Sequence, residues 1–141
     1  MRNYRLMKMT SKDKMPKSDE EWKDKLTSDQ YHVLREKGTE IPFTGKYWNA
    51  KDKGIYVCAG CGMPLFDSES KFDSDCGWPS FSSPINNQNT EEKQDKALLL
   101  PQTEILCRKC GGHLGHVFND GPMPTGLRFC VNSASLELKK K

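Results

Sequence analysis

The chain has 141 residues, of which 35% are hydrophobic and 29% charged, which indicates one soluble domain. The apolar runs, such as residues 97–100, are strand-sized, so no membrane-spanning helix is expected. The formal charge of +3 sits at the ends: residues 1–17 hold six Lys or Arg and one acidic residue, and residues 139–141 are three lysines. Residues 18–138 then hold 13 basic and 18 acidic side chains, which argues against a nucleic-acid binder.

Residues 1–17 contain no apolar h-region, so the sequence predicts no secretory signal and a cytoplasmic protein. The segment is basic and poor in acidic residues. We interpret it as a disordered tail, with an organellar transit peptide as the alternative. The folded domain is expected over residues 18–138, followed by a basic tail at 139–141.

Two helices are predicted at the start of the domain. Ser18–Glu21 has the form of a capping box and predicts a helix over about 19–26. Thr27–Gln30 repeats the pattern and predicts a second helix over about 28–37, ended by Gly38.

After Gly38 the pattern changes to short β-type runs separated by turn residues such as Asp-Gly-Pro. Residues 82–96 have no apolar face and are expected to form an exposed loop. The chain is therefore predicted to be two helices followed by a small antiparallel β domain. The expected strands are 54–58, 64–66, 97–100, 103–106, 115–118, 127–131 and 134–138.

Four of the six cysteines form two CxxC pairs, each followed by glycine as in zinc knuckles. Two pairs supply the closed tetrahedron of thiolates that a structural Zn²⁺ prefers, and such an ion would join distant parts of the chain. Three disulfides would need an exporting signal, and a redox CxxC would need a βαβ context; the sequence has neither. The predicted zinc ligands are Cys58, Cys61, Cys107 and Cys110.

The two remaining cysteines lie outside these pairs. Because side chains alternate along a strand, Leu127, Phe129 and Val131 should share one face of "LRFCVN". The opposite face then carries Cys130 between Arg128 and Asn132. A nearby cation lowers a thiol pKa, so this pattern predicts a reactive thiol.

The other lone cysteine, Cys76, stands in "CGWPSF", and it could resolve an oxidised partner thiol. Trp78 beside it offers an apolar surface to a small substrate group, although ordinary core packing explains it equally well. His113 and His116 would point to opposite faces of a straight strand, and a bulge at Gly115 could bring them together. Metal-ligand or core roles for these histidines remain open at this point. Asp120 could orient one imidazole.

Five stretches of the sequence together resemble methionine-R-sulfoxide reductase B. They are "GTEIPFTGKY", "CAGC", "FDSDCGWPSF", "CRKCGGHLGHVFNDGP" and "PTGLRFCVNSASL", in that order. The resemblance implies a mainly β fold of two small antiparallel sheets in a tent-like arrangement, with short N-terminal helices and one structural zinc. Gln102 and the loop from Ser82 depart from the family pattern.

The resemblance also implies a substrate, the R epimer of methionine sulfoxide in polypeptides, reduced by a monomer that thioredoxin recycles. Cys130 matches the catalytic nucleophile and Cys76 the resolving cysteine. The four paired cysteines match the zinc ligands. Further matches in the active site are His113, His116, Asp120, Arg128 and Asn132, with Trp78, Phe81 and Phe129 on the substrate side.

The mechanism expected from these matches begins with attack of the Cys130 thiolate on the sulfoxide sulfur. His113, directly or through water, is expected to supply the proton that the sulfoxide oxygen needs. A Cys76–Cys130 disulfide then closes. The rival interpretation is a binding module of the same fold, in which zinc holds the chain together and no reaction occurs. It accounts for the four paired cysteines but leaves Cys76 and Cys130 unexplained.

Overall fold

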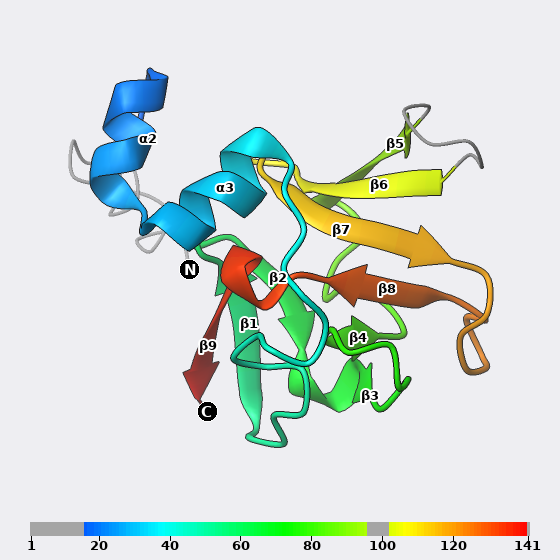
Figure 1. The fold of residues 1–141 in the computed structure, drawn as a ribbon. Helices are drawn as coiled ribbons and strands as arrows, with labels where there is room; N and C mark the ends of the chain where they lie inside the picture. The colour runs from blue at the N-terminus through cyan, green and yellow to red at the C-terminus, as the bar shows by residue number, and fades with distance from the viewer. Residues whose placement is uncertain (1–15, 96–101, 141) are drawn as a thin grey trace, which may run out of the picture.

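The computed structural model describes residues 16–95 and 102–140. Within these ranges, two short helices precede strands that pair into two antiparallel sheets (Figure 1). One sheet has the order β2-β1-β9 and the other β3-β4-β8-β7-β6-β5. In Figure 1 the strands of the smaller sheet run across the direction of those in the larger one. The expected mainly β fold of two small antiparallel sheets with N-terminal helices is confirmed.

The helices and strands have the following bounds. They are α2 Asp19–Lys25, α3 Ser28–Glu36, β1 Gly54–Cys58, β2 Pro64–Asp67, η2 Ser68–Ser70, β3 Lys71–Phe72, β4 Ser80–Phe81, β5 Thr90–Asp95, β6 Gln102–Cys107, β7 His113–Phe118, β8 Arg128–Val131, η3 Ser133–Ser135 and β9 Leu136–Lys140.

Both helices begin where the capping residues predicted. The Ser18 side chain accepts the N–H of Glu21, and Thr27 forms a complete capping box with Gln30. The left-handed residue that ends α3 is Lys37 (φ 59°) rather than Gly38. In the described part of the chain, no helix combines the length and apolar character needed to cross a membrane.

The segment expected to be an exposed loop, residues 82–96, contains strand β5, so that interpretation was wrong for Thr90–Asp95. Among the described residues this strand pairs with β6 alone, at the edge of the larger sheet, and residues 91–94 are exposed. An edge strand that faces water needs no apolar alternation, which is why the polar sequence hid it. The strand expected at 97–100 lies outside the described residues.

The last strand continues through Lys140, past the expected domain boundary at residue 138. Lys139 and Lys140 pair with Ile55 and Gly54 on β1. Backbone pairing does not depend on side-chain charge, so a lysine-rich end can complete a strand while its side chains reach solvent.

An aromatic cluster joins the two sheets. Phe66 on β2 stacks on Phe81 of β4 with ring centroids 4.4 Å apart, and it lies 5.9 Å from the ring of Phe129 on β8. Tyr56 on β1 meets Phe81 edge-on at 5.2 Å. Burial of large rings supplies most of the apolar stabilisation of so small a domain. The core therefore lies against one face of β4 and β8 and leaves their other face for a functional site.

Candidate active site and metal centre

Cys130 is held between two neighbouring strands. It lies opposite His116 of β7 on one side and Ser80 of β4 on the other. Directly opposed residues in antiparallel strands point to the same face of a sheet. Phe129 and Val131 are 2% and 0% exposed, whereas Cys130 is half-buried, so the expected alternation is confirmed.

Cys76 lies beside Cys130, although 54 residues separate them in the chain. The two Sγ atoms are 3.5 Å apart. A disulfide bond is about 2.05 Å long, so a small approach of the sulfurs would allow bonding. Gly77 has φ +91°, and a Cβ there would overlap Pro42, so the turn that aims Cys76 requires glycine.

The pKa values of the two thiols are shifted in opposite directions. Burial raises the pKa of Cys130, and Cys76 raises it further, while Arg128 opposes both effects. Burial also acts to raise the pKa of Cys76, but hydrogen bonds with Ser74 and Ser80 outweigh it and lower that pKa. The Ser74 hydroxyl donates to Cys76 Sγ at 3.0 Å. Cys76 is therefore the thiol of this pair that loses its proton first.

A bulge brings the two histidines to the same face of β7. The β6–β7 register shifts so that Ile105 pairs with Gly115 and Leu106 with His113. The rings of His113 and His116 then lie 5.6 Å apart, which confirms that a bulge next to Gly115 joins them.

Glu104 of β6, which the sequence interpretation missed, holds His113. Its Oε2 lies 2.6 Å from His113 Nδ1, and both side chains are almost fully buried. Burial lowers the pKa of His113 although Glu104 acts to raise it. The sequence shows Glu104 as a single carboxylate next to "IL" in an expected strand. Its partner could not be predicted, because it depends on the register between β6 and β7 and not on spacing along the chain.

Asp120 contacts Arg128 rather than an imidazole. Its two carboxylate oxygens accept from Arg128 Nε at 2.9 Å and Nη2 at 3.2 Å. The guanidinium also lies over the ring of Phe118, 4.5 Å from its centroid. The interpretation that Asp120 orients a histidine was therefore wrong, because the β7–β8 turn brings it to the guanidinium of Arg128.

Both thiols line a cavity of about 390 Å³ on this face of the sheet. The Trp78 indole and the His116 ring line it too, whereas His113 is 3% exposed and bonded to Glu104. Phe81 and Phe129 belong to the aromatic core on the opposite face. The lining residues that were not expected from the sequence include Phe118 and Thr39.

Replacing Cys76 with serine should lower the pKa of Cys130, because the charge and hydrogen bond of Cys76 both raise it. The midpoint of Cys130 alkylation by iodoacetamide should therefore move to lower pH than in the parent protein. Mass spectrometry at a series of pH values would locate and quantify the label. A midpoint that stays in place or rises would contradict this coupling.

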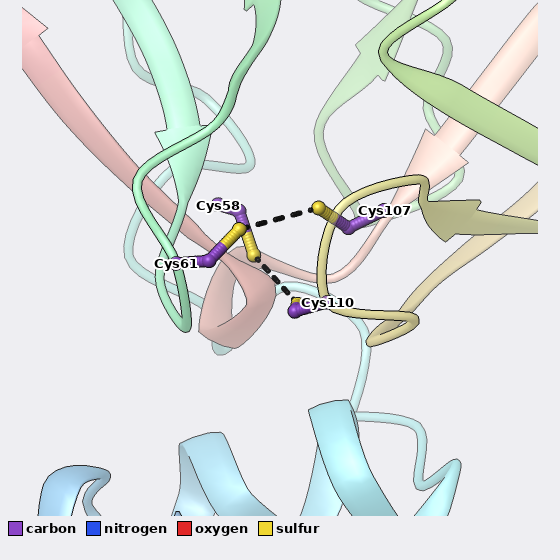
Figure 2. Close-up of side chains that lie close together, drawn as sticks. All are labelled: Cys58, Cys61, Cys107 and Cys110. Atoms are coloured by element: carbon purple, nitrogen blue, oxygen red, sulfur yellow. Dashed lines mark hydrogen bonds between the residues drawn. The ribbon is translucent and has the colours of Figure 1, made fainter. Parts of the chain in front are cut away.

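The four remaining cysteines meet in one cluster. Their Sγ atoms all lie within 4.8 Å of one another, with Cys58–Cys110 at 3.7 Å and Cys61–Cys107 at 3.4 Å (Figure 2). Four thiolates around Zn²⁺ at about 2.3 Å would have sulfurs about 3.8 Å apart. The cluster could therefore hold a metal ion, and its all-sulfur donor set fits zinc.

The two CxxC turns have the same backbone geometry. Gly62 N–H donates to the carbonyl of Cys58, and Gly111 N–H donates to that of Cys107, each at 2.8 Å. Both glycines have positive φ, so these turns favour glycine. One turn joins β1 to β2 and the other joins β6 to β7, so the cluster links the two sheets.

Cys107→Ser should lose the metal and much of the stability, since a structural metal contributes to folding directly. We expect zinc per chain to fall and Tm to drop by about 10 °C or more, as a loss of several kcal/mol implies. Elemental analysis and calorimetry would measure both. Cys76→Ser is the matched control and should keep its metal; a Cys107→Ser protein that loses zinc but melts normally would refute the structural role.

The SelR domain family matches residues 26–140. The chain belongs to this family. A protein of Hahella chejuensis (strain KCTC 2396) named "Peptide methionine sulfoxide reductase MsrB" is 59% identical over 124 residues, covering 88% of this chain and 89% of that protein. A protein of the same name from Bradyrhizobium diazoefficiens is 55% identical over 132 residues, covering 94% and 95%. The resemblance to methionine-R-sulfoxide reductase B is confirmed.

Among solved structures, the Mis18 "Yippee-like" domain has a TM-score of 0.49 and 16% identity, covering 63% of this chain and 97% of that one. The likeness is weak and concerns the fold alone. The family assignment depends on the sequence relatives.

Proposed function

We propose that the protein reduces the R epimer of methionine sulfoxide in oxidised polypeptides to methionine. Membership of the SelR family supports the reaction class. The observation that carries the proposal is the pair of thiols, 3.5 Å apart, in a cavity that an indole and an imidazole also line. A binding module without chemistry would need neither thiol in this position.

In the first step the Cys130 thiolate attacks the sulfoxide sulfur. The attack forms a bond between the two sulfurs while the sulfoxide oxygen takes a proton. The S–O bond of the substrate and the new sulfur–sulfur bond then break as the oxygen bonds to Cys130, and methionine leaves. Cys130 is then a sulfenic acid. Arg128 favours the thiolate through its charge, although burial and Cys76 act in the opposite direction.

The proton comes from the histidine pair. His116 lines the cavity and pairs with Cys130 across the two strands. His113 packs against the His116 ring and is itself bonded to Glu104. A proton held on His113 would therefore reach the sulfoxide through His116 or a water molecule rather than directly. Positioned imidazoles are the commonest groups for such transfers near neutral pH.

In the second step Cys76 attacks the oxidised sulfur of Cys130. Its lone pair forms the S–S bond, and hydroxide leaves and takes up a proton to become water. The hydrogen bonds of Cys76 with Ser74 and Ser80 favour the thiolate form that this attack needs. A dithiol of the thioredoxin class then reduces the disulfide and returns both thiols.

Substrate selection is proposed for the aromatic wall of the cavity. The Trp78 indole would hold the methyl group on the sulfoxide sulfur, and Asn132, which is 3% exposed and bonded through both ends of its amide, would shape the polar side of the cavity. Phe81 and Phe129 would support this wall from the core.

Zn²⁺ is proposed for the cluster of four cysteines. When bound, the ion would supply structural cross-linking, because four thiolates leave no open position for a reacting group. Cys58 and Cys61 would hold it from one sheet, and Cys107 and Cys110 from the other.

The decisive experiment uses separated R and S epimers of a peptide methionine sulfoxide, with dithiothreitol present. The parent protein should consume the R epimer and leave the S epimer unchanged. The rate of R-epimer reduction by Cys130→Ser should fall below about a tenth of the parent rate, because the substitution removes the attacking sulfur. Zinc content and Tm of the variant should match the parent; consumption of the S epimer, or a variant that keeps its rate, would refute the proposal.

Cys76→Ser separates the two halves of the cycle. The variant should still form about one methionine per chain in a single turnover, since the first step needs only Cys130 as thiol. Multiple turnover with thioredoxin should collapse, while dithiothreitol restores much of it by reaching Cys130 itself. A sulfenic-acid reagent should label Cys130 in the variant only. Normal turnover with thioredoxin would remove Cys76 from the mechanism.

A further inference from the structure

The segment 39–46, between α3 and β1, is part of "GTEIPFTGKY" and has no role in the mechanism above. It lies against two parts of the proposed site at once. Phe43 N–H donates to the carbonyl of Gly77, next to Cys76, at 2.8 Å. In Figure 1 the same cyan segment passes beside the short turn η3, drawn in red, which follows β8.

Glu40 connects these two parts through both its backbone and its side chain. Its carbonyl accepts the indole N–H of Trp78 at 3.0 Å, and its own N–H donates to Asn132 Oδ1 at 3.0 Å. Its carboxylate accepts the N–H groups of Ser133 at 2.9 Å and Ala134 at 3.0 Å.

The Glu40 carboxylate caps the η3 turn in place of a neighbouring capping side chain. The first N–H groups of a helical turn have no acceptor within the turn. Asn132, the residue at the cap position of η3, makes no capping bond with its side chain. Glu40, more than 90 residues away in the chain, supplies both acceptor oxygens, and its charge strengthens both bonds.

The contact with Glu40 also fixes which way the Asn132 amide faces. With Oδ1 on the N–H of Glu40, the amide nitrogen donates to the carbonyl of Leu114 at 3.0 Å. The opposite orientation would place an amide N–H against the N–H of Glu40. The backbone of one residue thus sets both the indole and the carboxamide of the cavity.

The packing around Glu40 leaves little room for it to move. A Cβ added to Gly45 would overlap Glu40 Oε2 and would lie 2.5 Å from Ser133 Oγ. Tyr47 N–H donates to that same hydroxyl at 3.0 Å. Because Gly45 has no side chain, its backbone can pack close to the η3 turn and leave room for the Glu40 carboxylate.

We infer that Glu40 is a positioning residue: its carboxylate fixes segment 39–46 on the η3 turn, so that its peptide group holds the Trp78 indole and the Asn132 amide in place. The inference rests on the substrate roles proposed for Trp78 and Asn132. A substitution at position 40 removes the carboxylate but keeps the peptide group. Any effect on Trp78 and Asn132 must therefore come from a change in the position of segment 39–46.

The test compares Glu40→Ala and Glu40→Gln with the parent, using R epimers of methyl and ethyl sulfoxides. We expect kcat/KM for the methyl substrate to fall between about tenfold and about a hundredfold in Glu40→Ala, as for a misplaced site. The methyl-over-ethyl preference should fall as well, as it should in Trp78→Ala. Glu40→Gln keeps one acceptor oxygen and should recover part of both.

Two controls separate positioning from simple loss of stability. Glu137→Gln removes a carboxylate from the exposed end of the smaller sheet and should behave as the parent. Gly45→Ala displaces the Glu40 carboxylate without replacing it and should reproduce the effect of Glu40→Ala. Assays run well below each variant's Tm, and the rate of Cys130 alkylation should stay near that of the parent.

Glu40→Ala with kcat/KM and methyl preference within about twofold of the parent would overturn the inference, even if its Tm falls. If Glu40→Ala does not fold, Glu40→Gln decides by the same criteria. Failure of the proposed function is distinguishable, because the parent would then show no R-epimer reduction or Trp78→Ala no change in preference.

Discussion

The pairing of β8 with a strand on each side is the constraint on which the proposed site depends. The same alternation that places Phe129 and Val131 in the core turns Cys130 and Arg128 toward the cavity. A register shift of one residue would exchange these faces and expose the aromatic core. Because Phe129 packs against Phe66 of the other sheet, that shift would cost core packing as well as the thiol position. The reactive thiol is thus held in place by the burial of its neighbours.

The four-cysteine cluster acts on the same site through β7. Cys110 ends one CxxC turn, and His113 begins β7 three residues later. A metal held there would fix the start of the strand whose bulge brings His113 and His116 together. Arg35 of α3 adds a hydrogen bond to the carbonyl of Cys110 at 2.9 Å, so the helices also support this turn. A metal bound in the cluster would therefore act on histidine geometry from outside the cavity, since no cysteine of the cluster lines it in the part of the chain that the structure describes.

Local patterns were sufficient to predict the helices, the faces of β8 and the four-cysteine cluster, because each depends on spacing within a few residues or on a known ligand set. The contacts missed from the sequence depend on how strands pair and how segments pack in space. Glu104 reaches His113 through strand register, and Glu40 reaches Ser133 across more than 90 residues. Strand β5 was missed for another reason, since a polar edge strand carries no apolar alternation. Gln102, which departs from the family pattern, lines the cavity and was recognised only as a difference.

The electrostatics of the thiol pair differ from what the sequence of β8 suggested. Arg128 does act to lower the pKa of Cys130, but Asp120 forms a paired contact with the guanidinium, and burial of the thiol prevails. Cys76 instead receives the hydrogen bonds that favour a thiolate. In the proposed cycle this order suits the second step, where Cys76 must attack a sulfenic acid. A protonated Cys130 is also a poor target for stray oxidants and alkylating agents. In the proposed first step the Cys130 thiol must therefore lose its proton against burial and the effect of Cys76, with Arg128 as the group that favours the thiolate.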